Sequence, residues 1–437
     1  MSDYMFMLES HLNGDQNKAV AKIRQAAEEA NVNLFLTGGA MRDMMGGFPI
    51  RDLDFTVEGP AVKLARAVSG LLVAEVLSTD EHRKSVELRG PANVKFSFAM
   101  ARTERTTKTG SKPQVQPATI HEDLRGRDFT VNAIALSLGK ASRGLLLDPT
   151  NGLGDLERKE LRAASPYALY DDPVRMLRIF RFCVRLGFTV EERTLAQLRN
   201  AKEAELETKI PATALNHELY QIAADPLSGD ILKVLEEQHL LHVFSPALAG
   251  PKLNLPGFQR LQKARQTLPF GYETNIDFYH LFLFLLLEKL TGKERGQLAK
   301  AAGIATTDYD AALRLESRAT KCERELAQAK LQRPSALYNL LSKVQPELLL
   351  FLLMRSGQRL VLDRIKNYLQ KYLPTALEVT EQEVIELGGE PGTPKYEKVH
   401  RQLIAARLDA RPKKVVVEEV PPPPPPPPAR RSATFAR

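Results

Sequence analysis

The chain has 437 residues, of which 43% are hydrophobic and 26% charged, and these are the proportions of a soluble globular protein with several domains. Its formal charge of +8 favours a polyanionic partner. The two cysteines form no metal-ligand or disulfide pattern, and neither a secretory signal nor a membrane-spanning apolar run is visible. We therefore expect a cytoplasmic protein with no membrane partner.

The first predicted elements surround a glycine turn. An amphipathic helix over residues 15–30 leads into a short apolar strand at Leu34–Thr37, and Gly38 and Gly39 follow at once. Residues 40–45 then suit a short helix. A Gly-Gly turn brings bare backbone N–H groups to the start of a helix, and such a turn favours phosphate.

Two aspartates follow on the next predicted strand. Leu53, Phe55 and Val57 alternate with polar residues, so Asp52 and Asp54 are expected on one face of that strand. Paired carboxylates repel each other unless a cation lies between them, and hard oxygen ligands suit Mg²⁺. A lone Asp-x-Asp is usually a solvated edge, but its combination with the glycine turn is far more specific.

Arg42, in the short helix after the glycine turn, is predicted to offer a fixed positive fork to the same phosphates. Arg127 and Asp128 precede another apolar segment, where such a pair taken alone is usually a surface ion pair.

The rest of the first 160 residues reads as an α/β or α+β head with a mixed sheet. We expect a helix, three strands, a polar mobile loop and a strand-rich piece, over residues 60–69, then 71–77, 85–89 and 94–101, then 104–119, and then 129–147.

From about residue 166 the patterns become those of an all-α body. We expect a helical neck over 161–250 and a helical body over 251–410, with 251–269 joining two sub-bundles and 280–287 forming a buried helix. Residues 411–437 contain eight consecutive prolines, which favour a disordered, extended tail.

The most informative predicted helix covers residues 171–186. Asp172, Arg175 and Arg178 recur every three residues and so line one face. In an isolated helix this pattern would indicate an exposed charged face.

The chain resembles the class II tRNA nucleotidyltransferases (CCA-adding enzymes) and the bacterial poly(A) polymerases, within the nucleotidyltransferase β superfamily. The resemblance rests on the combination and order of four segments: LFLTGGAMRDMMGGFPIRDLDF, ARTER, RGRDFTVNAIA and DDPVRMLRIFRFCVRL. The resemblance covers about residues 33–220. It implies a nucleotidyltransferase head in which Asp52 and Asp54 are catalytic and hold Mg²⁺. It also implies that Gly38, Gly39 and Arg42 hold the triphosphate and that Arg127 meets the nucleotide.

The same resemblance makes residues 171–186 a nucleotide-selecting helix. Cytosine and adenine each offer an amino donor beside a ring-nitrogen acceptor, which a carboxylate and a guanidinium can match. Asp172 and Arg175 would thus admit CTP and ATP, while UTP and GTP would leave both groups unpaired. Arg178 and Arg181 are similar to family arginines near the nucleotide.

Five positions depart from the family pattern, and the mildest departure is Asp171, where the family usually has Glu. Gly126 stands where the family usually has a further Arg, and Ser97 stands where it often has a third carboxylate. In the segment PATALNHE, Thr213 and Ala214 replace the Glu-Arg pair of the last motif. Because Ser97 stands in place of that carboxylate, the sequence leaves open whether a third metal ligand exists.

The resemblance implies template-independent addition of CCA to the 3′ end of tRNA, with CTP and ATP as substrates and the helical body binding RNA. A mobile loop at 104–119 favours full CCA addition over CC alone. Three alternatives stay open: an A-adding or CC-adding specialist, a poly(A) polymerase, and a non-catalytic RNA-binding protein of the same fold. The sequence leaves the oligomeric state open.

Overall fold

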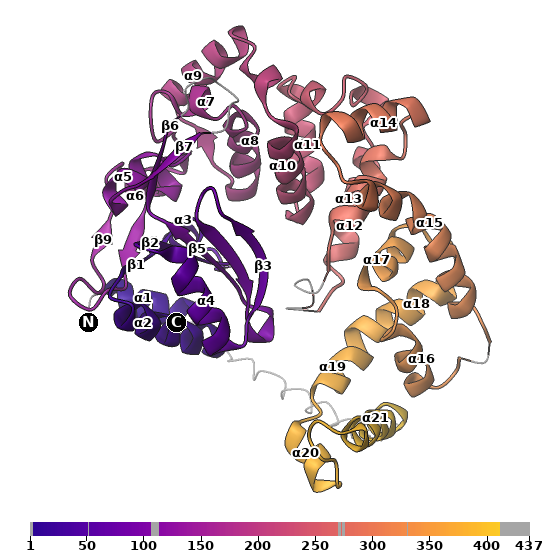
Figure 1. The fold of residues 1–437 in the computed structure, drawn as a ribbon. Helices are drawn as coiled ribbons and strands as arrows, with labels where there is room; N and C mark the ends of the chain where they lie inside the picture. The colour runs from indigo at the N-terminus through magenta and orange to yellow at the C-terminus, as the bar shows by residue number, and fades with distance from the viewer. Residues whose placement is uncertain are drawn as a thin grey trace, which may run out of the picture.

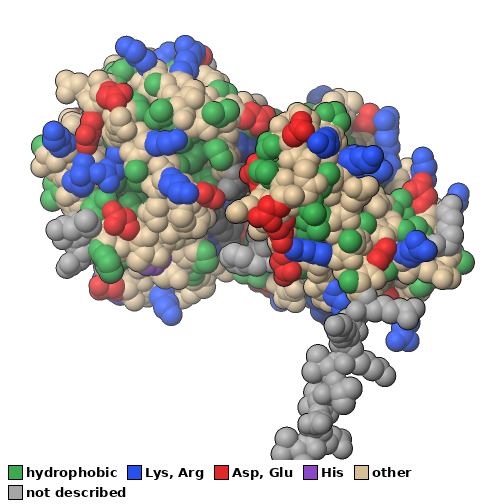
Figure 2. Space-filling model, turned by 90° about the horizontal axis from the view of Figure 1, so that it is seen from below, with side chains coloured by type: hydrophobic (Ala, Val, Ile, Leu, Met, Phe, Trp, Pro, Cys, Tyr) green, Lys and Arg blue, Asp and Glu red, His purple; other side chains and the backbone are tan. Residues whose placement is uncertain are grey.

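A computed structural model describes residues 3–50, 52–105, 113–269, 272, 276–329 and 331–410. Its elements follow an open arc, from a sheet-containing head through a helical neck to a helical body (Figure 1). The space-filling view shows two lobes with an indentation between them, and Lys and Arg side chains are scattered over both lobes (Figure 2). The expected proline-rich tail and the central part of the expected loop lie outside the described residues.

The head is built on a mixed sheet, as the sequence predicts. Among the described residues, seven strands pair in the order β3-β4-β5-β2-β1-β8-β9, and β2 and β5 are the parallel pair. The strands are β1 Asn33–Thr37, β2 Leu53–Glu58, β3 Glu75–Asp80, β4 Ser85–Arg89, β5 Lys95–Met100, β8 Ala135–Ser137 and β9 Leu146–Leu147. The register of β2 and β5 sets Asp54 beside Ser97.

Helices α2 (Gly14–Glu29) and α4 (Ala61–Leu72) pack on each other and on the sheet. Leu64, Ala65 and Val68 of α4 are buried, because their spacing places them on one helical stripe. The same core takes the alternate β2 residues Leu53, Phe55 and Val57, so Asp54 is directed to the opposite face of the sheet. The remaining head helices are α1 Asp3–His11, α3 Gly38–Met45, α5 Ile120–Arg125 and α6 Gly152–Arg158.

Two expectations for the head were wrong in detail. The strand expected at 71–77 begins only at Glu75, because α4 continues to Leu72 and ends at Val73 in the left-handed conformation. The segment 104–119, expected to be a loop, contains parts of a hairpin formed by β6 (Arg102–Arg105) and β7 (Gln114–Pro117).

The helix expected over 171–186 is interrupted. Helix α7 (Ala168–Asp171) ends before Asp172, whose φ of −143° and ψ of 94° are extended, and α8 begins at Arg175 and runs to Leu186. The physical reason is Pro173, because the residue before a proline is sterically disfavoured from the helical region. Asp172 therefore does not lie on the helical face of Arg175 and Arg178.

The neck contains one short parallel strand pair, β10 (Glu160–Leu161) with β11 (Thr189–Val190), in addition to its helices. The other neck helices are α9 Glu192–Glu203, α10 Ala212–Ala224 and α11 Ser228–Glu237. The expected change from a mixed head to a helical neck is confirmed.

The body is helical throughout its described residues. Its helices are α12 Leu255–Arg265, α13 Tyr279–Leu287, α14 Gly292–Ala301, α15 Thr306–Leu326, α16 Pro334–Leu341, α17 Pro346–Arg355, α18 Arg359–Asn367, α19 Leu373–Leu377, α20 Glu381–Glu386 and α21 Pro394–Asp409. A π-helical segment at Tyr368–Tyr372 joins α18 to α19. Helix α12 corrects the expectation that residues 251–269 merely join two sub-bundles.

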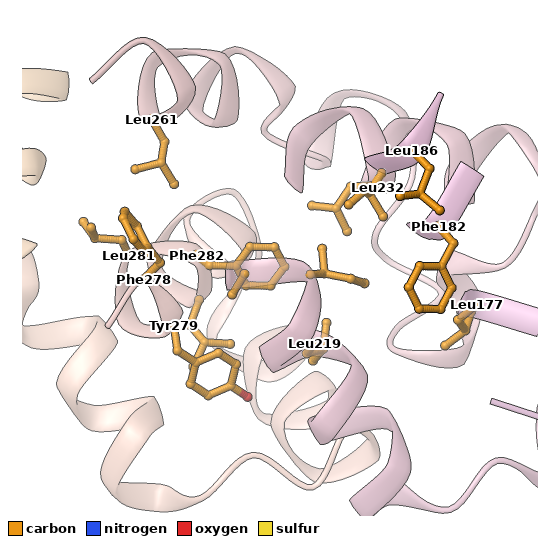
Figure 3. Packing of buried hydrophobic residues seen from close by; sticks show 14 of the residues in the cluster. Leu177, Phe182, Leu186, Leu219, Leu232, Leu261, Phe278, Tyr279, Leu281 and Phe282 are labelled. Atoms are coloured by element: carbon orange, nitrogen blue, oxygen red, sulfur yellow. The ribbon is translucent and has the colours of Figure 1, made fainter. Parts of the chain in front are cut away.

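A continuous apolar core joins neck and body. Leu177 and Phe182 of α8, Leu219 of α10 and Phe282 of α13 belong to one cluster (Figure 3). Helix α13 is apolar on every side, and its residues from Tyr279 to Leu287 are buried except His280, so the expected buried helix is confirmed. Within the described ranges, no helix combines the length and apolar character needed to cross a membrane.

Candidate active site

The glycine turn begins α3 directly after β1. Gly38 has a φ of +64°, which a residue with a side chain rarely adopts. A Cβ added to Gly38 would lie 3.1 Å from Arg127 Nη1, and one added to Gly39 would lie 3.3 Å from Asp54 Oδ2. Bare backbone is thus required here, and it lies between a guanidinium and a carboxylate.

Asp54 faces this turn from the neighbouring strand. Its Oδ1 accepts a hydrogen bond of 2.7 Å from Ser97 Oγ, which leaves Oδ2 on the side of Gly38 and Gly39. Asp52 is exposed and lies in a bend just before β2, two residues from Asp54, so the strand alternation expected from the sequence does not extend to it.

These two carboxylates fit Mg²⁺ by the chemistry of their donor atoms. They are hard oxygens beside a turn that can take phosphate, and Mg²⁺ is commonly held by one or two carboxylates together with substrate oxygens. Ser97, at the position of the third family carboxylate, donates to Asp54 instead of adding a negative charge. No group of three or more His, Cys, Asp or Glu side chains suited to a metal occurs in the described part of the chain.

The Arg127 side chain lies beside the glycine turn and is held there by hydrogen bonds. Its Nη2 donates to Asp123 Oδ2 at 2.8 Å, to Thr56 Oγ1 at 2.9 Å and to Thr37 Oγ1 at 3.3 Å. Burial on its own lowers the pKa of Arg127, but the carboxylates of Asp123 and Asp54 raise it overall. A permanent positive charge therefore lies next to the glycine turn.

The loop that carries Arg127 also contacts helix α8. Arg175 Nη1 donates to the carbonyl of Arg127 at 3.4 Å, and Arg175 Nη2 donates to the carbonyl of Gly126 at 3.2 Å. Asp172 Oδ2 lies 3.8 Å from Arg175 Nε. Although Asp172 is not on the helical face, the structure brings it to Arg175, as the base-selection hypothesis requires.

Arg178 and Arg181 lie further along α8 and face a buried carboxylate. Arg181 Nε donates to Glu218 Oε1 at 2.5 Å, and Arg178 Nε lies 3.5 Å from Glu218 Oε2. Arg181 is only 6% exposed, so its guanidinium is committed to the α8–α10 contact. A direct contact of Arg181 with a nucleotide, as expected from the sequence, does not agree with this placement.

Asp128 joins the same set of charges. Arg178 Nη1 lies 3.5 Å from Asp128 Oδ2, and Asn132 Nδ2 donates to Asp128 Oδ1 at 3.0 Å. Burial on its own raises the pKa of the Asp128 carboxyl, but Arg178, Arg175 and the hydrogen bond from Asn132 hold it below its usual value.

The fixed positive fork for the phosphates, expected at Arg42, does not agree with the placement of this side chain. Arg42 is 3% exposed, its Nε and Nη2 donate to Asp43 Oδ1 at 2.9 and 2.6 Å, and its Nη1 donates to Asn132 Oδ1 at 2.7 Å. Its guanidinium also lies 5.1 Å from the ring centre of Phe182. A buried guanidinium keeps its charge only among such partners, and they occupy all three of its nitrogens.

Sequence reasoning missed several residues that build this region. Glu218 lies at the end of the segment 211–218, in which the Glu-Arg pair of the last motif is missing, and Asp43 directly follows Arg42 in the sequence. Thr37 and Thr56, each 1% exposed, had no signal beyond their place in apolar strands. A buried carboxylate is recognised only once its distant arginine partners are known.

The chain is similar in sequence to known proteins. Residues 34–162 match the family model of the poly A polymerase head domain. The chain is 30% identical over 346 residues to an A-adding tRNA nucleotidyltransferase of Aquifex aeolicus, covering 77% of this chain and 40% of that protein. It is 34% identical over 225 residues to a multifunctional CCA protein of Stenotrophomonas maltophilia, covering 50% of this chain and 52% of that protein.

Solved structures show the same fold. A tRNA nucleotidyltransferase complexed with a primer tRNA and an incoming ATP analog superposes with a TM-score of 0.51 at 26% identity, covering 81% of this chain and 99% of that one. A CCA-adding enzyme in an apo form superposes with a TM-score of 0.57 at 23% identity, covering 94% of this chain and 96% of that one.

The chain spans about half the length of the curated relatives it matches, between 40% and 56% for two A-adding enzymes and the CCA protein. The match of the head nevertheless includes β1, the glycine turn, β2 and the Arg127 loop. Residues 34–162 thus match the poly A polymerase head domain, and the resemblance of the chain to the tRNA nucleotidyltransferases and poly(A) polymerases is confirmed.

Proposed function

We propose that this protein is a cytoplasmic tRNA nucleotidyltransferase that adds C and A nucleotides to the tRNA 3′ end without a template, using CTP and ATP. The observation that most supports this proposal is the arrangement of the loop around Arg127. The Arg127 side chain lies against Gly38 and faces Asp54, while the Arg127 backbone carbonyl accepts a hydrogen bond from Arg175 of the proposed selecting helix α8. The elements for phosphate, metal and base therefore meet at one loop.

In the proposed reaction, the 3′-hydroxyl of the RNA attacks the α-phosphate of the triphosphate and pyrophosphate leaves. The backbone N–H groups at Gly38 and Gly39 and the positive charge of Arg127 hold the triphosphate. Asp52 and Asp54 would bind Mg²⁺, which when bound offsets charge on the attacking and leaving oxygens. Ser97 keeps the Asp54 carboxylate in one orientation through its hydrogen bond.

Base choice is assigned to Asp172 and Arg175. Arg175 Nε is buried and has no hydrogen-bond partner among the residues that the structure describes, and the Asp172 carboxylate stands 3.8 Å from it. A carboxylate and a guanidinium side by side can accept from the amino group and donate to the ring nitrogen of cytosine or adenine. A base with the reverse pattern would leave both protein groups unpaired.

The helical body is proposed to bind tRNA through phosphate charge and helix shape. Supporting this, a matching solved structure contains a primer tRNA and an incoming ATP analog. Lys and Arg side chains are scattered over the visible face of both lobes, so a partner that spans both lobes fits this distribution better than one confined to a single patch (Figure 2).

A second candidate is an enzyme that adds only the terminal A. The names of three curated relatives favour it, since they are A-adding tRNA nucleotidyltransferases. The hairpin of β6 and β7, at the place of the expected mobile loop, is compatible with both full CCA addition and A addition.

The test of the proposed function uses two tRNA substrates, one that ends at the discriminator base and one that ends in CC. Extension of both to CCA supports full addition, and extension of the second alone indicates an A-adding enzyme. Long A tails on a generic RNA would indicate a poly(A) polymerase. Asp54→Asn removes a metal ligand with almost no change in volume, so it should abolish addition while the melting temperature stays close to that of the wild type. Wild-type rates in this variant would place the metal elsewhere.

Base selection has its own test in Asp172→Ala. Because Asp172 is half-buried and lies outside α8, its removal should leave the helix in place. The expected result is a lower ratio of kcat/KM for CTP and ATP over UTP and GTP. An unchanged ratio would remove Asp172 from base choice.

A further inference from the structure

A closed ring of polar contacts links the glycine-turn helix α3 to helix α8. Arg185, in the last turn of α8, donates from Nη2 to Asp43 Oδ2 at 3.1 Å. The other oxygen of Asp43 accepts from Arg42, whose Nη1 continues to Asn132 Oδ1 at 2.7 Å. The chain of contacts thus passes from α8 to α3 and on to the loop that follows Asp128.

The ring then returns to α8. Asn132 Nδ2 donates to Asp128 Oδ1 at 3.0 Å, and Asp128 Oδ2 lies 3.5 Å from Arg178 Nη1. Arg178 and Arg185 are seven residues apart on α8, about two turns, and therefore lie on the same face. We call the six residues Arg42, Asp43, Asp128, Asn132, Arg178 and Arg185 the α8 bracket.

The middle of the bracket is buried and its contacts are directional, while the side chains of Arg178 and Arg185 at its two ends are 26% and 17% exposed. Arg42 and Asp43 are each 3% exposed, and the ring centre of Phe182 on α8 lies 5.1 Å from the Arg42 guanidinium. Buried ion pairs contribute little net stability compared with apolar residues of similar volume, because both charges must lose their water. Bonds to a planar guanidinium do, however, depend strongly on direction, so they define one position of the helix.

Helix α3 connects the glycine turn to the bracket, because it begins with Gly38 and Gly39 and contains Arg42 and Asp43. We propose that Asp43 is a positioning residue that sets α8 in register with the glycine turn, so that Arg175 meets the base of a nucleotide whose phosphates lie on that turn. This inference rests on the proposed function for its effect on base choice. In this proposal Arg42 connects Asp43 to Asn132 within the bracket.

The test compares Asp43→Asn with a control outside the bracket. Asp43→Asn keeps the shape of the side chain and removes its charge, so Arg42 and Arg185 lose their shared anchor. A displacement of about 1 Å can change a rate on the order of a hundredfold. We therefore expect the ratio of kcat/KM for ATP and CTP over UTP and GTP to fall about tenfold or more, with little change in KM for tRNA. Glu288→Gln, which disturbs the Glu288–Arg355 pair of the body, should lower the melting temperature without changing that ratio.

Two further measurements keep the proposal decidable. Arg185→Gln removes the other partner of the contact between α8 and α3, so it should also lower the base ratio. The double variant should show less than the product of the two single effects. Hydrogen exchange of the α8 backbone amides should be faster in both single variants than in the wild type and in Glu288→Gln. If both variants fold and keep the wild-type base ratio, or if α8 exchanges at the wild-type rate, the proposal is overturned.

The proposed function and the bracket fail in different ways. If the wild type adds no nucleotide to any tRNA, the proposed function is wrong, while hydrogen exchange still shows whether Asp43 holds α8. If the wild type is active and selective but both variants select equally well, the function stands and the positioning role of Asp43 is wrong.

Discussion

A substitution of Glu218 would measure how strongly buried ion pairs hold helix α8 against helix α10. Glu218 is 0% exposed on α10, with Arg181 Nε at 2.5 Å and Arg178 Nε at 3.5 Å. Glu218→Gln retains the volume and removes the charge, so no cavity forms and the buried Arg181 guanidinium loses its carboxylate, while Arg178 keeps Asp128. Breaking one partner of a buried ion pair costs about 3–5 kcal/mol, because the remaining charge has no compensation.

This magnitude converts into a large thermal shift. For a cooperative unit of 150–250 residues, each kcal/mol of stability corresponds to roughly 2–4 °C in melting temperature. Taking head and neck as that unit, we expect Glu218→Gln to lower the melting temperature by about 6–20 °C. Calorimetry and urea titration followed by circular dichroism would measure the shift and the free energy of unfolding.

Glu397→Gln is the matched control. Glu397 pairs with Arg401 on α21 at 3.9 Å, and their side chains are 76% and 66% exposed. Exposed pairs of this kind contribute about 0–1 kcal/mol, so this variant should melt close to the wild type. If Glu218→Gln loses no more stability than Glu397→Gln, the reasoning that buried charge balance holds α8 against α10 is refuted.

Two other predictions concern backbone space and acidity. A Cβ on Gly152 would lie 2.1 Å from the carbonyl oxygen of Thr130, whereas one on Gly296, inside α14, meets nothing within 4 Å. Gly152→Ala should therefore lose about 1–3 kcal/mol or more, while Gly296→Ala should gain about 0.5–1 kcal/mol, both measured by urea unfolding. Because the folded-state pKa of Asp128 lies below 3.8, its charged form stabilises the protein above that pH, and this contribution is lost as the pH falls through the folded pKa. The unfolding free energy of Asp128→Asn should thus fall less than that of the wild type on acidification below pH 4, and equal slopes would contradict the assignment.

Local patterns were enough to predict the elements nearest the proposed chemistry. The alternation of Leu53, Phe55 and Val57 predicted β2, and the structure confirms that these residues face the core. The Gly-Gly pair predicted a turn into a helix, and Gly38 has the positive φ that only glycine adopts easily. Both are properties of a few consecutive residues, and so they can be read without knowing the rest of the fold.

The interruption before α8 is also determined locally, by Pro173, although the prediction of one continuous helix was wrong. The three-residue recurrence of Asp172, Arg175 and Arg178 predicted one continuous helical face. Pro173 instead keeps Asp172 extended, and the carboxylate reaches Arg175 from outside the helix. A steric rule that acts between two neighbours here overrides a periodicity spread over seven residues.

The partners of the arginines were decided only by the tertiary structure. Arg42 donates to Asn132, which is 90 residues away, and Asp43 accepts from Arg185, which is 142 residues away. Each of these side chains looks exposed and available when only its neighbours in sequence are considered. Whether a guanidinium meets a phosphate or a buried carboxylate depends on which distant element packs over it, because burial removes water and leaves the charge dependent on its nearest partner.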